Sequence, residues 1–214
     1  RSLPSFPTRR SSDLGVRDLL VRAGATPGVG ADVLRLDRRL VSECMDRCPR
    51  EVVLAGRGRA ALLRTAGAEP AFWSCPGMCL WREGGRRPFT RADMADAARL
   101  LDRLQNVGVV FGMSLDDVAP HARDVVGLHT MAANTTKHVR VLCFSPAGAE
   151  ALREMRAVVS ASPWLSVGFT AHGPLRWTNL ALEIFRATAG AGIPASVNGE
   201  PMAGVSGPVT LAGA

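Results

Sequence analysis

The sequence predicts an α/β fold: a partial (β/α)₈ TIM barrel of about four βα units, preceded by a small amino-terminal α/β unit. Two observations predict this fold. Four apolar segments typical of strands are each followed by a segment typical of a helix, at intervals of roughly 30 residues. A closed barrel takes about 250 residues, and residues 89–214 provide about half of that length. An open doubly wound sheet of four or five strands is the competing fold.

Residues 15–88 are predicted to form the small α/β unit. Its expected elements are a helix over 16–23, a second helix with apolar residues at helical spacing over 33–44, a strand over 51–55 and a hairpin over 72–81. The first helix is expected to stop at Gly24. The polar run 83–88 is expected to be a linker, which places the domain boundary before Phe89.

Residues 89–214 are predicted to form the first half of the barrel. The expected strands are 107–113, 139–144, 165–170 and 193–197. A helix that starts near Thr90 precedes the first strand, and helices that start near Pro120, Ser145, Pro174 and Ser206 follow the four strands in turn. Thr90 and Asp93 have the spacing of a capping box. Ser145 followed by Pro146 is typical of a helix start, because proline is favoured at the first helical position.

The first 14 residues are predicted to be a non-native tail. Ser5 to Leu14 reads SFPTRRSSDL, which resembles the in-frame translation of a common sequencing adapter. The segment has no hydrophobic period, and Pro4 and Pro7 would break a helix. A natural disordered tail is the alternative, and either interpretation sets the segment apart from the fold.

The composition of the 214 residues is that of an ordinary soluble globular protein, with 47% apolar and 21% charged residues. The net charge of +7 comes almost wholly from arginine, because Lys137 is the only lysine among 26 basic residues. This bias is typical of compositional drift, so a nucleic-acid partner is not expected. No apolar stretch approaches the ~18 residues of a membrane span. Five cysteines at low density and the absence of a signal-like start predict a cytoplasmic protein.

Two motifs carry a resemblance to a known family. One is the stretch NTTKH over residues 134–138, and the other is Gly192-Ile193-Pro194 followed by EPMAGVSGPVTLAG over residues 200–213. Together they resemble the trimethylamine and glycine betaine corrinoid methyltransferase family, over about residues 16–214. The resemblance implies a (β/α)₈ barrel enzyme that transfers a methyl group from a methylated or quaternary amine to the Co(I) corrinoid of a separate partner protein. It also implies that this chain is the amino-terminal half of such an enzyme, truncated and inactive alone.

Chemistry in a barrel takes place at the carboxyl ends of the strands. Glu200 follows the last expected strand, and its carboxylate could orient a cationic ammonium, so it is predicted to be catalytic together with His172. Asn198, Thr170 and Ser114 lie at the same predicted edge and are expected to bind substrate through neutral hydrogen-bonding groups. No metal site is expected, because the spacing of the C-x₃-C pairs is uncommon for zinc.

The sequence is also compatible with two other functions. Lys137 could form the Schiff base of an aldolase or lyase, although its position before a strand places it at the opposite end of a barrel. A non-catalytic betaine-binding domain is the second alternative. If the ligand is a quaternary ammonium, Trp73 or Trp81 is its expected cation–π partner.

Overall fold

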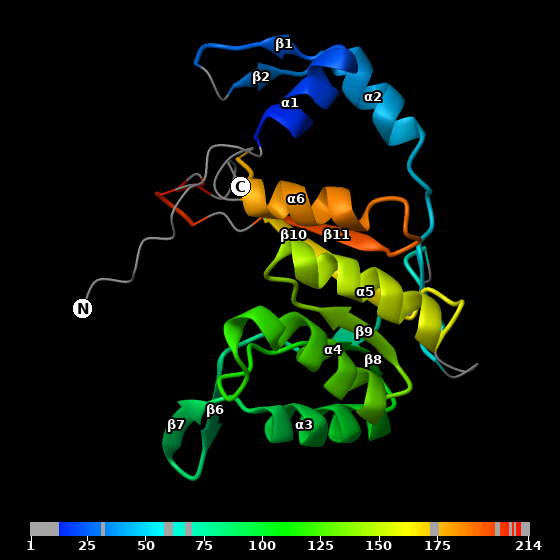
Figure 1. Cartoon of the computed structure of the whole chain (residues 1–214), viewed down its shortest axis with the longest axis vertical. Coiled ribbons are helices and arrows are strands. Elements are labelled where there is room, and N and C mark those ends of the chain that lie inside the picture. The colour runs from blue at the N-terminus through cyan, green and yellow to red at the C-terminus, as the bar shows by residue number, and fades with distance from the viewer. Residues whose placement is uncertain are drawn as a thin grey trace. The chain divides into compact units, whose positions relative to one another are not determined.

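The structure is a computed structural model that describes residues 13–30, 33–57, 62–66, 70–171, 176–199, 202–205, 207, 209 and 210. The chain divides into two compact units, residues 1–50 and residues 51–214 (Figure 1). The division differs from the expected boundary at residue 88, because residues 51–88 belong to the second unit. Of the expected 14-residue tail, residues 1–12 lie outside the described residues, and Asp13 begins the first helix.

The first unit consists of α1 (Asp13–Arg22), β1 (Thr26–Pro27), β2 (Leu34–Arg35) and α2 (Arg38–Asp46). The predicted stop of the first helix at Gly24 is confirmed, since Gly24 adopts a φ of +109° that favours glycine. The second helix begins later than predicted. The Asp37 side chain caps it by accepting a 2.7 Å hydrogen bond from the Arg39 amide, which leaves Leu34–Arg35 free to pair with β1.

The second unit contains the remaining elements. They are β3 (Val53–Ala55), β4 (Leu62–Arg64), β5 (Phe72–Trp73), β6 (Cys79–Arg82), β7 (Gly85–Pro88), α3 (Arg91–Arg103), β8 (Val107–Phe111), a short 3₁₀ helix (Pro120–Ala122), α4 (Arg123–Asn134), β9 (His138–Val141), α5 (Pro146–Val159), β10 (Leu165–Ala171), α6 (Asn179–Thr188) and β11 (Ala195–Gly199). The four predicted barrel strands are thus present as β8, β9, β10 and β11. The helix expected from Pro174 begins only at Asn179, where Thr178 caps it.

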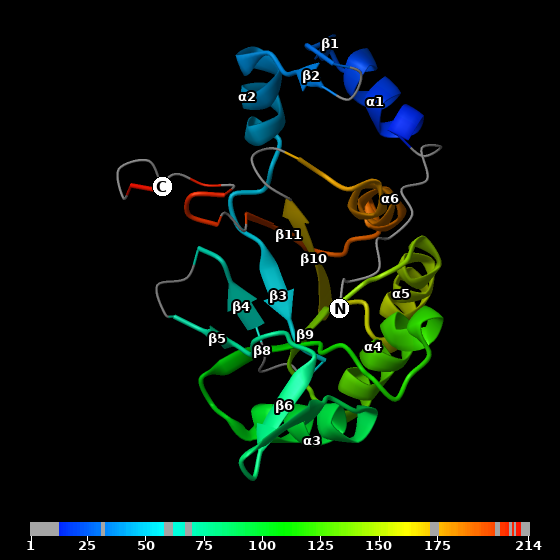
Figure 2. The same cartoon turned by 90° about the vertical axis from the view of Figure 1, so that its left-hand side faces the viewer.

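The order of the strands identifies the fold as a partial barrel. Five strands form one parallel sheet in the order β5, β8, β9, β10, β11, which follows the chain without a reversal. A doubly wound sheet would reverse its strand order at a switch point, with helices on both faces. Here α3 to α6 pack on one another in sequence, and Figure 2 shows α4, α5 and α6 on the same side of the sheet. The predicted partial (β/α)₈ barrel is therefore confirmed.

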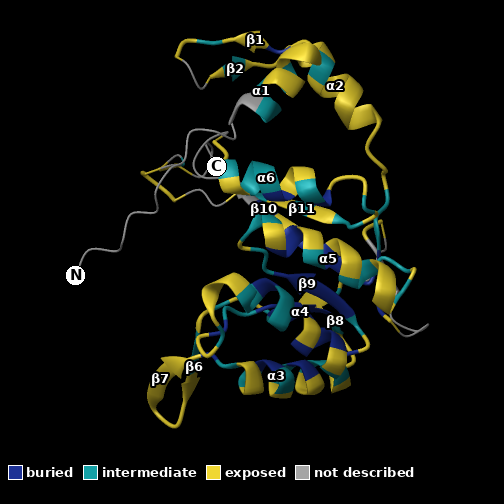
Figure 3. Cartoon of the chain, in the orientation of Figure 1, coloured by how far each residue is buried: buried dark blue, intermediate teal, exposed yellow. Residues whose placement is uncertain are grey.

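The hydrophobic core lies between this sheet and the helices (Figure 3). Its buried side chains include Val110, Val139, Val141, Leu165, Val167 and Phe169 from the strands and Met94, Ala98, Leu128, Met131, Leu152 and Ile184 from the helices. Trp164 is fully buried in the same core, and its indole N–H donates a 3.2 Å hydrogen bond to the Arg156 carbonyl. Alternate residues of each strand thus bury one apolar face against the helices.

The predicted hairpin over 72–81 and the linker over 83–88 are both wrong. The hairpin pairs β6 with β7 and turns at Glu83 and Gly84, which both have positive φ as a type I′ turn requires. Phe72–Trp73 instead pairs in parallel with β8 and joins the barrel sheet. A local sequence pattern could not reveal this pairing, because its partner strand lies beyond the whole of α3.

The capping box at the start of α3 is confirmed and extends to a third residue. The Asp93 carboxylate accepts hydrogen bonds from the Thr90 amide (2.9 Å) and hydroxyl (2.7 Å), while the Thr90 hydroxyl accepts from the Asp93 amide. Arg87 donates two further hydrogen bonds to the same carboxylate, at 2.6 and 2.7 Å. These hydrogen bonds, that of Arg87 first, hold the pKa of Asp93 well below its ordinary value.

We expect Asp93→Asn to lower the free energy of unfolding by about 1 kcal/mol at pH 7, the usual effect of a lost helix cap. Because the pKa of Asp93 is lower in the folded chain, its stabilisation is present above pH ~4 and is lost in stronger acid. The difference between variant and parent should therefore shrink between pH 5 and pH 2 in denaturation followed by circular dichroism. Asp96→Asn is the matched control, since Asp96 forms only an exposed ion pair with Arg99. Equal losses for the two variants would contradict this role of Asp93.

Candidate functional site

The face of the barrel sheet that points away from the helices is mostly polar. The strand register places on this inner face Trp73, Val109, Phe111, His138, Arg140, Ser166, Gly168, Ser196 and Asn198. The apolar side chains that alternate with them lie on the opposite face of the sheet, where they pack against the helices. Any ligand inside the barrel would therefore meet hydroxyl, amide, guanidinium and aromatic groups.

Two of the predicted site residues lie side by side. Asn198 of β11 is half-buried and pairs in register with Thr170 of β10, of which the structure describes the backbone. Ser114 is also half-buried, but it follows β8, three strands away from β11, or about 14 Å along the sheet. Its amide donates a 2.9 Å hydrogen bond to the Gly77 carbonyl. His172 and Glu200 follow β10 and β11 and lie outside the described residues.

His138 is an inner-face residue that the sequence analysis did not select. It is almost fully buried, and its Nδ1 lies 3.0 Å from the Ala55 carbonyl and 3.1 Å from the Pro163 carbonyl. Because carbonyls only accept, we assign the ring proton to Nδ1, and Nε2 accepts from the Ser166 hydroxyl at 2.8 Å. Burial lowers the pKa of His138 to about 4, so the ring is neutral at pH 7. It joins β3, β9 and β10 at the amino-terminal end of the barrel.

Arg140, two residues further along β9, is the charged group of this face. It is only 6% exposed, and its guanidinium carbon lies 4.5 Å from the centre of the Phe111 ring and 5.3 Å from that of Trp73. Trp73, which was expected to contact a ligand cation, therefore has a cation of the protein itself beside it. The sequence did contain a signal for this contact: Gly168 lies within a strand, where glycine often marks a close approach.

Lys137 acts as a helix cap in the structure. Its ammonium donates hydrogen bonds to the carbonyls of Leu101, at 2.7 Å, and Leu104 at the end of α3, which also accept from the amides of Leu104 and Val107. Nearby, Asp102 accepts from the Thr135 hydroxyl (2.8 Å) and the Thr136 amide (2.7 Å). The NTTKH motif thus ties the end of α3 to the start of β9. Burial lowers the pKa of Lys137, as a Schiff-base lysine requires, but the residue lies at the amino-terminal end of the barrel, opposite the edge where barrel enzymes carry their chemistry.

The loop after β9, at the carboxyl edge, is held by a buried carboxylate. Asp124 of α4 accepts hydrogen bonds from the amides of Phe144 (2.9 Å) and Ser145 (3.1 Å). Gly148 makes room for it, since a β-carbon there would lie 1.9 Å from the carboxylate. Burial, together with this carboxylate, raises the pKa of the Cys143 thiol to about 12. Cys143 therefore stays protonated at pH 7 and is no nucleophile.

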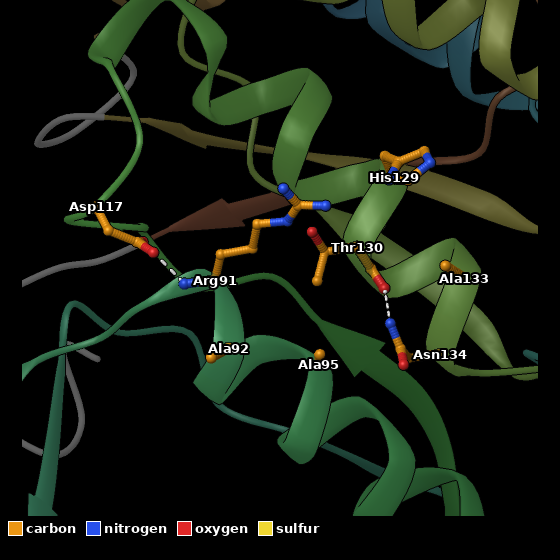
Figure 4. A pocket seen from close by; sticks show the side chains of 8 residues that line it. All are labelled: Arg91, Ala92, Ala95, Asp117, His129, Thr130, Ala133 and Asn134. Carbon is orange, nitrogen blue, oxygen red and sulfur yellow. Dashed lines mark hydrogen bonds between the residues drawn. The ribbon is translucent and has the colours of Figure 1, made fainter.

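A hollow of about 360 Å³ lies between α3 and α4, in the helical layer (Figure 4). Its lining residues are Arg91, Ala92, Ala95, Asp117, His129, Thr130, Ala133 and Asn134. Two of its polar contacts are internal, because the Arg91 amide donates to Asp117 and the Asn134 amide group donates to the Thr130 carbonyl, each at 2.8 Å. The hollow lies among the helices, away from the inner face of the sheet that carries Asn198.

The described residues contain no group of three or more His, Cys, Asp or Glu side chains arranged to hold a metal ion. In the C-x₃-C pair of the first unit, the Cys48 thiol donates a 3.4 Å hydrogen bond to the Cys44 carbonyl. Within the same described ranges, no helix has the length and apolar character that crossing a membrane requires.

Comparisons with known proteins agree with the fold. The sequence profile of the trimethylamine methyltransferase (MTTB) family matches residues 12–214. The curated trimethylamine methyltransferase MttB of Desulfitobacterium hafniense is 25% identical over 207 residues, which cover 92% of this chain and 42% of that protein. The crystal structure of the hydroxylamine complex of MtmB superposes with a TM-score of 0.58 at 11% identity, covering 89% of this chain and 44% of the other. The chain thus spans less than half the length of both proteins.

The buried imidazole of His138 predicts a pH-dependent stability. An unfolded histidine titrates near pH 6.5, whereas the pKa of His138 is about 4 in the folded chain. The unfolded chain therefore binds more protons between these values, so stability falls as the pH drops from 6.5 to 4, by about 3 kcal/mol in all. Urea denaturation at pH 7.0, 5.5 and 4.5 measures this change in the free energy of unfolding. His138→Gln should flatten this dependence and His129→Gln, at an exposed position of α4, should keep it; a parent curve that is flat over this range would refute the assignment.

The helix-capping role of Lys137 predicts the behaviour of its amine. Treatment of the folded chain with pyruvate and borohydride should leave Lys137 unmodified, and the urea-unfolded chain should gain mass there, as measured by peptide mass spectrometry. Lys137→Met should lower the free energy of unfolding by about 1–2 kcal/mol, because two carbonyls lose a charged donor. Preferential trapping at Lys137 in the folded chain would instead support the aldolase alternative.

Proposed function

Because this chain belongs to the trimethylamine methyltransferase (MTTB) family, we propose that it contributes the first βα units of a barrel enzyme that removes a methyl group from a methylated amine. The observation that carries the proposal is the extent of the family match, which runs from residue 12 to residue 214 and spans all five strands of the barrel sheet. The carboxyl ends of these strands form the edge where barrel enzymes hold their substrates.

The proposed substrate is a methylated or quaternary amine, such as trimethylamine or glycine betaine. A corrinoid on a partner protein, when bound, would supply the Co(I) nucleophile that accepts the methyl group, and we place the reaction in the cytoplasm. The described residues offer no cluster of metal ligands, and the Cys143 thiol holds its proton. We therefore assign no residue of this chain as a cobalt ligand and derive only what the chain itself does to the amine.

The chain's own contribution is to bind and orient the ammonium. Glu200 follows β11 directly and alternates in phase with Asn198, so an extended continuation of the strand would direct its carboxylate to the inner face. A carboxylate there attracts the cation, while Asn198 and Thr170, paired across β10 and β11, offer neutral hydrogen-bonding groups next to it. His172 follows the neighbouring strand and is proposed to adjoin the same site, with Ser114 at the far side of the edge.

Glu200→Gln tests this assignment in a protein that carries this chain together with the rest of the barrel. The substitution keeps the shape and removes the charge, so demethylation efficiency should fall roughly 30- to 1000-fold, the equivalent of about 2–4 kcal/mol for a lost charge partner. The assay is methyl transfer from the amine to a reduced corrinoid protein. Glu154→Gln, an exposed glutamate of α5, is the matched control and should leave the activity unchanged.

The same assay separates the proposal from its alternatives. If Glu200→Gln retains parental turnover and amine affinity, the carboxylate only caps its loop and the site assignment is wrong. If the parent protein binds the amine and never demethylates it with reduced corrinoid protein present, the function is that of a non-catalytic betaine-binding domain.

A further inference from the structure

The guanidinium of Arg140 is a buried charge that has no counter-ion among the residues the structure describes. The side chain is 6% exposed, and it makes no hydrogen bond or ion pair with any residue in the described ranges; its Nε is buried without a partner. Burial lowers the pKa of Arg140, but an arginine stays charged at pH 7. Buried charges in proteins are normally paired, because desolvation of a lone charge is unfavourable.

The residues around this guanidinium hold it in place but accept no hydrogen bond from it. Its carbon lies 4.5 Å from the Phe111 ring centre and 5.3 Å from that of Trp73, and ring faces leave the in-plane N–H groups free to donate. On the other side, a β-carbon at Gly168 would lie only 1.9 Å from Nη2 of Arg140. The glycine therefore opens the space that the guanidinium occupies over β10.

A second unsatisfied group lies beside this space. Ser196 of β11 pairs in register with Gly168, so its side chain lies on the same inner face, one strand further along the sheet. The Ser196 hydroxyl oxygen is buried and also has no partner among the described residues. Buried polar side chains are nearly always hydrogen-bonded, so two donors without partners, one from β9 that reaches over β10 and one from β11, indicate a missing acceptor between them.

We propose that Arg140 and Ser196 bind a carboxylate group in the barrel interior. A carboxylate carries the single negative charge that matches one guanidinium, it accepts two parallel N–H bonds in the plane of the fork, and it can accept a third from the hydroxyl. The carboxylate belongs either to a small ligand or to an acidic side chain of strands that complete the barrel. The inference rests on contacts of this chain alone and holds whether or not the proposed demethylation does.

Acetate is the probe for this site in the 214-residue chain, with sodium chloride at equal ionic strength as the reference. We expect a saturable change in tryptophan fluorescence with acetate and none with chloride, because Trp73 lies against Arg140. Arg140→Met should weaken acetate binding at least tenfold, and Ser196→Ala should weaken it several-fold. Arg156→Met is the matched control. The Nε of Arg156 is also buried without a partner among the described residues, but Arg156 lies on α5 in the helical layer, so its loss should leave acetate binding unchanged.

Circular dichroism verifies that each variant is folded. Should Arg140→Met fail to fold, Gly168→Ala replaces it, because the added methyl group displaces the guanidinium while keeping its charge. The proposal is overturned if acetate and chloride act alike on the folded parent, or if acetate binding survives both substitutions.

A longer protein with the complete barrel distinguishes the two sources of the carboxylate. Acetate binding that persists there, and disappears in Arg140→Met, supports a ligand-borne carboxylate. Acetate binding that is lost there, with a melting temperature that falls more for Arg140→Met than for Arg156→Met, supports an acidic side chain from the remaining strands. If neither acetate binding nor a selective loss of stability is seen there, the proposal is wrong.

Discussion

The in-register parallel pairing of β8, β9, β10 and β11 is the constraint on which the rest of the structure depends. Because paired residues share a face, the apolar residues that alternate along these strands all turn toward α3 to α6 and form one core. The same pairing sends the intervening residues into the barrel, whatever their polarity. His138 and Ser166 are hydrogen-bonded to each other there, whereas the Arg140 Nε and the Ser196 hydroxyl have no hydrogen-bond partner among the described residues. The strand register thus places these two polar groups inside the barrel without hydrogen-bond partners among the described residues.

The two ends of the barrel differ in how fully their polar groups are used. At the amino-terminal end, Lys137 and Asp102 bind the end of α3 and the start of β9, and His138 joins three strands. Their side chains are committed to internal hydrogen bonds, as expected of the end of a barrel that provides stability. At the carboxyl edge, Asp124 fixes the loop after β9, while Asn198 lies at the edge itself. This asymmetry agrees with the proposal that the substrate binds at the carboxyl edge, while the amino-terminal end stabilises the fold.

The fold and the family membership rest on independent observations. The sequential strand order excludes a doubly wound sheet without reference to any other protein, and the profile match concerns the sequence alone. The open edge of the sheet fits the length comparison: Val197 on β11 is 65% exposed on the face that buries Val141 and Val167 in the neighbouring strands. A further βα unit would cover this side chain, and the relatives are more than twice as long as the part that matches.

The sequence by itself determined the features that depend on near neighbours: the four barrel strands, the stop at Gly24, and the caps at Thr90 and Ser145. Their physical cause is hydrogen bonding and periodicity within a few residues, which a linear pattern records. It also predicted that Thr170 and Asn198 meet at one edge, but it did not identify Ser114 as distant from them. Only the tertiary structure decided the environments of the inner face and of Lys137. His138 contacts a carbonyl 83 residues away, and Lys137 caps a helix more than 30 residues before it. Contacts of that range depend on which strands become neighbours, and no local pattern encodes this.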